Sequence, residues 1–248
     1  MPAARDRWPT AVAVFDVDRT LLDGAAGYMF FQWLRKNGRV TARGWLDIAA
    51  SVAAYRTRLR PETAIVRVGA TSLAGLPMER VDEWADACVA ESIAPHIFAE
   101  AEKTIRRHRK MRHFTMLASG SCQPIVEAIA RHVGAHAGVG TRALVDPATG
   151  RYTGRAELPL CYHEGKAEWV RRRAEREGVS MDECHVYTDN GMDRPLLEMA
   201  THPNAVNPDG LLLPLAKERG WPVHAWSTLA DPDRSRTGSF GPLRADAK

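Results

Sequence analysis

Four short groups of residues carry side chains that can do chemistry. They are Asp16-Val-Asp18, Ser119-Gly-Ser121, Lys166, and Asp189 with Asp193. Paired carboxylates act as acids, bases or metal ligands, while hydroxyls at a helix N-terminus and lysines hold anions such as phosphate. Each group alone is a weak signal, because acidic loops, helix N-caps and surface lysines are common. In this order along one chain, the groups together predict a single site.

Each group lies beside an element that can hold it in place. Short apolar runs precede both acid pairs and the serine group, and such runs are typical of strands buried on both faces of a parallel sheet. The predicted strands are residues 11–15, 114–118 and 184–188, with shorter candidates at 205–206 and 223–226; the predicted helices are residues 124–133 and 166–177. Strand and helix alternate, so the sequence predicts an α/β fold with a Rossmann-like parallel sheet and helices on both faces. Ligands of such sheets bind at the carboxyl ends of the strands, where all four groups would meet.

A long helical stretch follows the first strand. Apolar residues recur at helical spacing up to a stop at Asn37-Gly38, from Thr41 to a stop before Pro61, across residues 64–73, and from Val81 to a break near Pro95. These segments predict a helical-bundle cap inserted after the first strand. Residues 139–144 and 152–158 predict a β-hairpin. We expect an α/β core of residues 10–24 and 94–230, a cap of residues 25–93, and flexible ends at residues 1–9 and 231–248.

Composition excludes several classes of protein. With 248 residues, 45% of them hydrophobic, the chain can bury a sizeable core, which excludes a disordered or disulfide-stapled chain. No apolar run approaches the roughly 20 residues that cross a bilayer. The four cysteines lie far apart without a C-x-x-C pair, which indicates a reduced, cytoplasmic protein without a zinc site of cysteines. The sequence does not indicate an oligomeric state.

Charge and histidine spacing give no sign of a macromolecular partner or a histidine metal site. A formal net charge of +4 is too small to indicate nucleic acid, and the one dense basic run, residues 103–112, suits the C-terminal end of a helix. His132 and His136 alone have the spacing of a helical metal pair, and Gly134 between them is more typical of a helix end.

The four groups resemble the four motifs of the haloacid dehalogenase (HAD) superfamily of phosphatases. The resemblance rests on Phe15-Asp-Val-Asp-Arg-Thr-Leu-Leu22, Ala118-Ser-Gly120, Gly165-Lys166, and Thr188-Asp189 with Asp193, and it spans the chain from Val12 to about Trp226. The helical insertion resembles the cap of the branch that includes phosphoserine phosphatase. The resemblance implies Mg²⁺-dependent hydrolysis of a small phosphorylated metabolite, a phosphate monoester, through an aspartyl-phosphate intermediate. It implies no nucleic-acid or membrane partner.

The resemblance also implies a role for each site residue. Asp16 is the nucleophile, and Asp18 protonates the leaving alcohol and then deprotonates the attacking water. The implied Mg²⁺ ligands are the carboxylates of Asp16 and Asp189 and the backbone carbonyl of Asp18, with Asp193 supporting the metal site. The implied phosphate-binding residues are Ser119, Gly120, Lys166 and Thr20.

Three positions depart from the phosphoserine phosphatase pattern. Arg19 stands where the family more often has a small residue, and Met192 stands where those enzymes carry Asn. Ala25 stands where they carry a Glu that binds the substrate ammonium group, and Asp23 is the one nearby carboxylate that could compensate. The sequence therefore predicts a phosphorylated alcohol other than serine, with histidinol phosphate or a sugar-like or lipid-like phosphate as candidates.

Three other functions use part of the same pattern. A haloacid dehalogenase needs the first aspartate but has no use for Asp18. A phosphotransferase that passes the phosphoryl group to an alcohol uses the same residues, and the sequence does not separate it from a hydrolase. A non-catalytic binding protein on the same fold would not need both Asp16 and Asp18.

Overall fold

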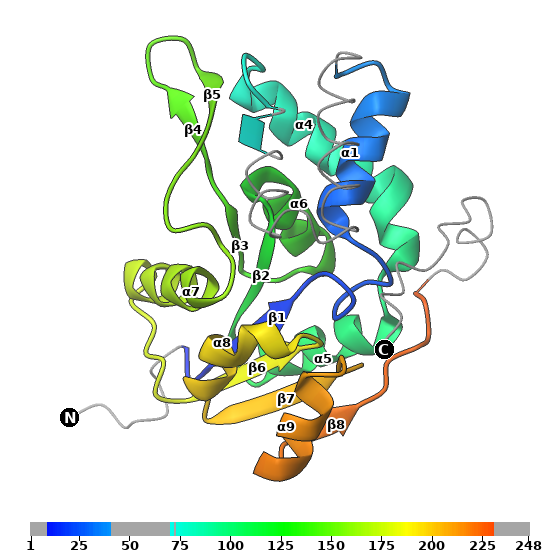
Figure 1. Ribbon diagram of the computed structural model, residues 1–248, viewed down its shortest axis with the longest axis vertical. Helices are drawn as coiled ribbons and strands as arrows, with labels where there is room; N and C mark the ends of the chain where they lie inside the picture. Colours follow the sequence, from blue (N-terminus) through cyan, green and yellow to red (C-terminus); the bar gives the residue numbers. More distant parts are fainter. Residues whose placement is uncertain (1–8, 41–69, 72, 231–248) are drawn as a thin grey trace.

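A six-stranded parallel sheet forms the centre of the protein (Figure 1). The computed structural model describes residues 9–40, 70–71 and 73–230. The strand order is β3-β2-β1-β6-β7-β8, and every neighbouring pair is parallel. The strands are β1 (Val12–Asp16), β2 (Phe114–Cys122), β3 (Ala137–Thr141), β6 (Cys184–Thr188), β7 (His202–Val206) and β8 (Val223–His224). The predicted α/β class with a parallel sheet is confirmed.

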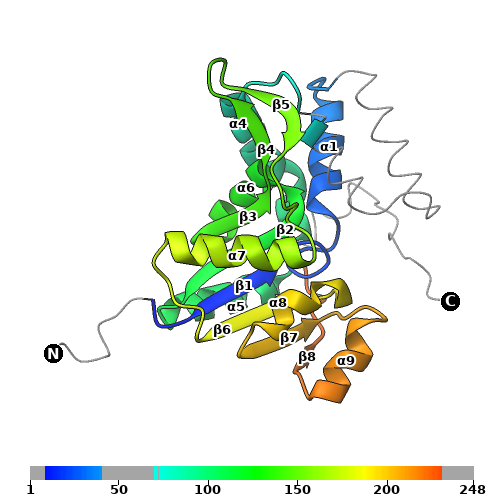
Figure 2. The same ribbon diagram turned by 60° about the vertical axis from the view of Figure 1, so that its left-hand side comes forward.

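Helices cover both faces of this sheet (Figures 1 and 2). One face packs against α5 (Ala99–Lys110) and α6 (Gln123–Val133), and the other against α7 (Glu164–Arg176), α8 (Arg194–Glu198) and α9 (Leu212–Arg219). Side chains alternate along a strand, so Ala13 and Phe15 of β1 join the first of these hydrophobic clusters while Val12 and Val14 join the second. The predicted burial of the first strand on both faces is confirmed. The basic run ends α5, as predicted.

The insertion after β1 contributes two described helices, α1 (Ala26–Lys36) and α4 (Met78–Cys88). A π-helical turn (Val89–Ile93) and a 3₁₀ turn (Ala94–His96) continue α4 to the break predicted near Pro95. Phe30 of α1 and Val81 of α4 share a hydrophobic cluster with Ile125 of α6, so the insertion packs on the α6 side of the sheet. The predicted helix between Thr41 and Pro61 and nearly all of the helix over residues 64–73 lie outside the described residues.

The structure corrects two predicted strand assignments. Residues 139–141 belong to β3 of the main sheet, and the hairpin consists of β4 (Ala143–Asp146) and β5 (Arg151–Ala156). Strand β2 does not end before the serine group but continues through Cys122, which pairs with Thr141 after a register shift that begins at Ala118. Pairing with the neighbouring strand outweighs the turn preference of Ser-Gly-Ser, because Thr141 Oγ1 also donates to the Gly120 carbonyl at 2.9 Å.

The β4–β5 hairpin is hydrogen-bonded to the segment that leads into α4. The Gly75 amide donates to the Tyr152 carbonyl at 2.8 Å, the Tyr152 amide to the Leu76 carbonyl at 3.0 Å, and the Met78 amide to the Gly150 carbonyl at 3.0 Å. Figure 2 shows the hairpin rising beside α4. Backbone hydrogen bonds therefore join the insertion to a segment much later in the sequence.

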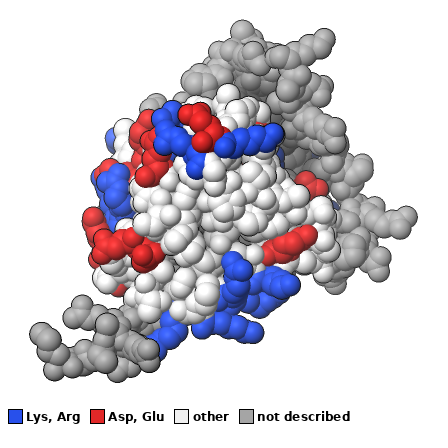
Figure 3. All heavy atoms as spheres, turned by 90° about the horizontal axis from the view of Figure 1, so that it is seen from below, with Lys and Arg blue, Asp and Glu red and all other residues white. Residues whose placement is uncertain are grey.

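The surface view agrees with the dispersed charge of the sequence. On the face that Figure 3 shows, Lys and Arg side chains form separate groups near the edges, several of them beside Asp or Glu, around a broad uncharged area. Among the helices of the described residues, none has the length and apolar character needed to cross a membrane.

Candidate active site

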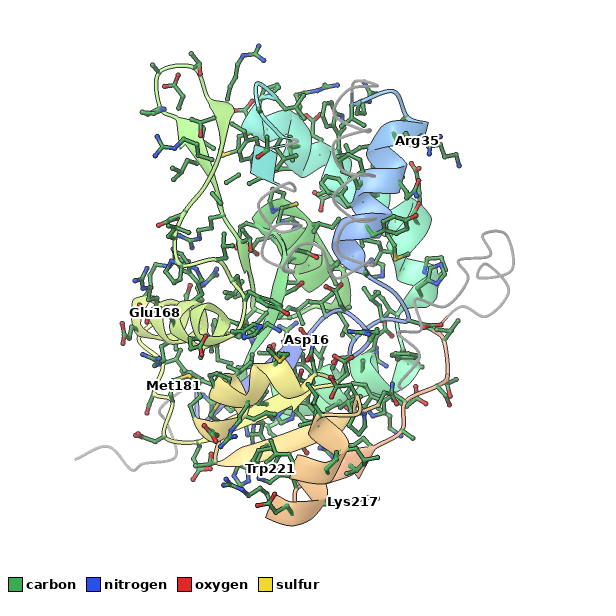
Figure 4. All side chains as sticks on the ribbon, in the orientation of Figure 1. Asp16, Arg35, Glu168, Met181, Lys217 and Trp221 are labelled. Carbon is green, nitrogen blue, oxygen red and sulfur yellow. The ribbon has the colours of Figure 1, made fainter. Side chains whose placement is uncertain are left out.

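The four predicted groups meet at the carboxyl ends of the central strands. Asp16 is the last residue of β1, Asp189 directly follows β6, and Lys166 lies in the first turn of α7. Figure 4 shows Asp16 near the middle of the molecule, whereas Arg35 lies at the far end of α1. The structure therefore agrees with the rule that ligands of a parallel sheet bind at the carboxyl ends of its strands, from which we expected these groups to meet.

Lys166 contacts two of the aspartates of the site, Asp16 and Asp193. Its Nζ lies 2.7 Å from Asp16 Oδ1 and 2.7 Å from Asp193 Oδ2, and its side chain is only 5% exposed. Burial alone lowers the pKa of a lysine, but the two carboxylates outweigh this and hold the pKa of Lys166 well above its ordinary value. Lys166 is therefore a fixed cation that orients both carboxylates.

A close backbone contact explains the glycine before this lysine. A Cβ at Gly165 would collide with the Leu160 carbonyl oxygen, so only glycine lets the start of α7 approach this loop. The amides of Gly165 and Lys166 donate to the Tyr162 and His163 carbonyls, each at 3.0 Å. The Gly-Lys motif thus sets the position of Nζ through packing.

We expect Gly165→Ala to push the start of α7 away from Leu160 and to move Nζ from the carboxylates. Overpacking of this kind costs about 1–3 kcal/mol of unfolding free energy, and activity should fall more than this loss of folded protein explains. Denaturant unfolding and steady-state kinetics measure the two effects. Gly210→Ala is the matched control, because nothing lies within 4 Å of a Cβ there. Wild-type kinetics in Gly165→Ala would contradict this role of Gly165.

Asp16 and Asp189 are buried carboxylates that repel each other. Burial, and then the charges of neighbouring aspartates, raise the pKa of Asp16 to about 7 and that of Asp189 to about 8, although Lys166 lowers the first and Arg19 the second. Arg19 Nε lies 3.3 Å from Asp189 Oδ2. The Thr20 hydroxyl lies 3.3 Å from Asp189 Oδ1 and accepts a 2.8 Å hydrogen bond from the Asp189 amide. Once these two carboxyls ionise, they concentrate negative charge at this point that Lys166 and Arg19 compensate only partly.

The donor set fits a hard divalent cation. Asp16 and Asp189 offer carboxylate oxygens, and within the described residues Oδ2 of Asp16 accepts no hydrogen bond. Oxygen ligands around uncompensated negative charge are what Mg²⁺ requires. Asp193 differs, because its Oδ2 already accepts from Lys166 and, at 2.7 Å, from the Thr188 hydroxyl. Its contacts suit the supporting role predicted for it.

Asp18 is fixed by the first helix of the insertion and by β2. Its Oδ1 accepts a 2.6 Å hydrogen bond from the Ala26 amide at the start of α1, and its Oδ2 accepts a 3.2 Å hydrogen bond from the Ser119 hydroxyl. Burial raises the pKa of Asp18 above its ordinary value, and the Ala26 hydrogen bond opposes this. A carboxyl group that keeps its proton to higher pH is suited to donate it.

The residues predicted to hold phosphate fall into two pairs. Lys166 and Ser119 contact the aspartates of the first motif directly. The hydroxyl of Thr20 instead contacts Asp189, and the Gly120 carbonyl accepts from Thr141. Contact of any of the four with phosphate stays a prediction.

Sequence reasoning gave no role to two residues that shape the site, Thr188 and Asp209. Thr188 orients Asp193, and Asp209 Oδ1 accepts hydrogen bonds from the amides of Gly191 and Leu212 at 3.2 and 2.7 Å. Asp209 thereby holds the loop that carries Asp189 and Asp193. Its position shortly after a predicted strand, in Asn-Pro-Asp, was the available signal.

Comparison with known proteins identifies the family. The family model for haloacid dehalogenase-like hydrolases matches residues 13–198. A probable phosphatase of Mycobacterium tuberculosis is 32% identical over 220 residues, covering 87% of this chain and 75% of that protein. A histidinol-phosphatase of Neisseria meningitidis is 30% identical over 223 residues, covering 86% of this chain and 97% of that protein.

Solved structures support the same fold. A Bordetella pertussis protein of unknown function superposes with a TM-score of 0.76 and 26% identity, over 86% of this chain and 97% of that chain. A substrate-bound phosphoserine phosphatase superposes with a TM-score of 0.56 and 20% identity, over 86% of this chain and 92% of that chain.

The chain belongs to the haloacid dehalogenase-like hydrolase family. The predicted enzyme class, a HAD-type phosphatase, is confirmed by the family and by the phosphatase names of its relatives.

Proposed function

We propose that this enzyme hydrolyses a small-molecule phosphate monoester through an aspartyl-phosphate at Asp16, with Mg²⁺ bound. One observation carries the proposal: a buried lysine holds one oxygen of Asp16 at 2.7 Å, while a second aspartate two residues on is held by α1 and Ser119. This arrangement orients a nucleophile and fixes a separate proton donor beside it. A solved phosphoserine phosphatase at 19% identity is a phospho-aspartyl intermediate analogue, which supports the same chemistry on this fold.

The proposed reaction has two displacements. In the first, Asp16 Oδ2 forms a bond to phosphorus as the bond to the leaving oxygen breaks, and Asp18 gives its proton to that oxygen. In the second, Asp18 takes a proton from water, the water oxygen attacks phosphorus, and the carboxylate of Asp16 is released. Lys166 and Ser119 hold the phosphoryl oxygens in both steps.

The proposed ligands of Mg²⁺ are the carboxylates of Asp16 and Asp189 and the backbone carbonyl of Asp18, with Asp193 in support. When bound, the cation supplies positive charge that reduces the repulsion between these carboxylates and the phosphate dianion. Arg19 and Lys166 supply part of the same compensation from the chain itself.

Release of inorganic phosphate from p-nitrophenyl phosphate tests the proposal. We expect turnover with Mg²⁺ and none after exhaustive chelation. Nitrophenol release that exceeds phosphate release when an alcohol is added would identify a phosphotransferase. Halide release from a 2-haloacid would identify a dehalogenase, and no turnover of either substrate with Mg²⁺ present would favour a binding protein.

The raised carboxylate pKa values predict how Mg²⁺ stabilises the fold. The folded chain keeps protons on Asp16 and Asp189 up to about pH 7 and 8, whereas the ordinary pKa is 3.8. Between the ordinary pKa and these raised pKa values, the folded state therefore binds more protons than the unfolded state. The stability that these protons contribute is lost as the pH rises through the raised pKa values. Mg²⁺ binds the ionised carboxylates, so its stabilising effect should grow over the same range.

Thermal unfolding with Mg²⁺ and with a chelator, at about pH 5.5 and about pH 8.5, measures this effect. We expect a larger Mg²⁺-induced rise in Tm at the higher pH, and we expect Asp189→Asn to remove most of it. An Mg²⁺ effect that is equal at both pH values would contradict the assignment.

The substrate is proposed to be an alcohol phosphate other than phosphoserine. A closed site that selects phosphoserine needs an anion for its ammonium group, because an unpaired buried charge is strongly unfavourable. Ala25 precedes α1 and provides no carboxylate, and Asp23 is exposed. Kinetics on a panel of phosphate esters should therefore show no preference for L-phosphoserine. A preference of about a hundredfold in kcat/KM, roughly 2.7 kcal/mol, would disprove this.

A further inference from the structure

Three histidines from separate segments face one another on the α5 side of the sheet. His108 lies near the end of α5, His113 lies in the turn before β2, and His185 lies in β6. One ring nitrogen from each lies within 4.8 Å of the other two. His108 is buried, while His113 and His185 are half-buried. The cluster is separate from the active site, because His185 pairs with Ala13, three residues before Asp16 in β1.

Hydrogen bonds orient the central ring of this cluster. His108 Nε2 lies 2.9 Å from the Tyr187 hydroxyl, and His108 Nδ1 lies 2.9 Å from His113 Nδ1. When His108 Nε2–H donates to the Tyr187 hydroxyl, the lone pair of His108 Nδ1 points toward His113. In metal sites, the nitrogen that does not bind the metal commonly donates to an outer partner, as Nε2 does here. Within the part of the chain that the structure describes, the ring nitrogens of His185 have no hydrogen-bond partner.

Imidazole binds metals in its neutral form, so the groups that surround the cluster matter for binding. The charged or titratable groups that face the cluster are Arg107 of α5, Glu183 before β6, and His202 and Tyr187 of the strands. Glu183, which lies 3.0 Å from His202 Nε2, is the anion among them and favours a bound cation, whereas Arg107 opposes it.

We propose that His108, His113 and His185 bind one divalent transition-metal ion of the Zn²⁺ type. Imidazole nitrogens suit such ions, whereas Mg²⁺ selects oxygen. Ligands at about 2.0–2.1 Å from Zn²⁺ lie roughly 3 to 3.4 Å from one another. The Nδ1 atoms of His108 and His113 are 2.9 Å apart, and one nitrogen from each of the three rings lies within 4.8 Å of the others, so the rings must turn toward a common ion to bind it.

Solvent reaches the cluster through a neighbouring hollow. A cavity of about 410 Å³ is lined by His185, Tyr187 and His202, among others. Three protein ligands leave a coordination position for water. The bound ion would join the end of α5, the turn before β2 and strand β6, and it would therefore stabilise the fold.

Zn²⁺ titration of tag-free, chelator-treated protein against a chromophoric competitor tests the proposal. Excess Mg²⁺ is kept present to compete for the aspartate site. We expect each chain to take up one Zn²⁺ ion in competition with the chromophoric chelator. The affinity for this ion should fall at least tenfold in His113→Gln and in His185→Gln. Tyr187→Phe, which removes the outer partner of His108, should weaken binding by about tenfold to a hundredfold.

Exposed His132 provides the control, and His132→Gln should bind Zn²⁺ as the wild type does. Thermal unfolding gives a second measurement: Zn²⁺ should raise the Tm of the wild type and of His132→Gln but not of His113→Gln. If His185→Gln fails to fold, the half-exposed His113 variant decides. Equal Zn²⁺ affinity in wild type and His113→Gln, or no binding at all, would show a packed histidine cluster without a metal site and overturn the proposal. Either result leaves the proposed phosphatase mechanism untouched.

Discussion

Asp16→Asn is expected to abolish hydrolysis while the chain folds as before. The amide has nearly the shape of the carboxylate, and its oxygen can still accept from Lys166, but it is a poor nucleophile toward phosphorus. Loss of a catalytic nucleophile typically lowers kcat by more than about a thousandfold. Phosphate release and thermal unfolding, measured on the same preparation, separate the chemical effect from a folding effect.

The exposed Asp182 provides a matched control for this substitution, since Asp182→Asn makes the same chemical change far from the site. Activity near wild type in Asp16→Asn, with an unchanged Tm, would rule out Asp16 as the nucleophile. Loss of activity together with a large fall in Tm would indicate a structural role instead.

Lys166→Met is expected to reduce both stability and activity. The substitution leaves Asp16 and Asp193 side by side without the cation that Nζ placed 2.7 Å from each. Removing one member of a buried ion pair costs about 3–5 kcal/mol, because the remaining charge stays buried without a partner. Denaturant unfolding measures this loss, and Lys217→Met, an exposed site in α9, is the control.

A second substitution separates charge repulsion from the loss of side-chain packing. Adding Asp193→Asn to Lys166→Met removes one of the two uncompensated carboxylates, so we expect part of the stability to return while activity stays low. If the double variant is no more stable than Lys166→Met, repulsion between the carboxylates is not the cause of the loss.

The sequence predicted the sheet and the convergence of the site for identifiable reasons. Val12 to Phe15 form an apolar run with an acid at its end, and the parallel topology implied by alternating strands and helices brings Asp16, Lys166 and Asp189 to one edge. The Gly165-Lys166 pair was also recognisable in the sequence as one of the four motifs. The structure adds its cause, which is the backbone contact with Leu160.

Other features depend on contacts that the local sequence does not encode. The extension of β2 through Cys122 results from pairing with β3, against the turn preference of Ser-Gly-Ser. Thr188 and Asp209 act through hydrogen bonds whose geometry exists only once the loop is folded. His108 and His185 are more than 70 residues apart, and spacing along a single helix could not reveal them as neighbours.

The hydrogen bonds between the β4–β5 hairpin and residues 75–78 determine how this protein can be recombined with its relatives. In a chimera that exchanges only the insertion, residues of the relative replace Gly75 and Met78, whose amides donate to the carbonyls of Tyr152 and Gly150. One side of this contact is then foreign to the other. Moving residues 143–156 together with the insertion keeps both sides of this contact. The natural module for exchange is therefore discontinuous in the gene, although it is continuous in space.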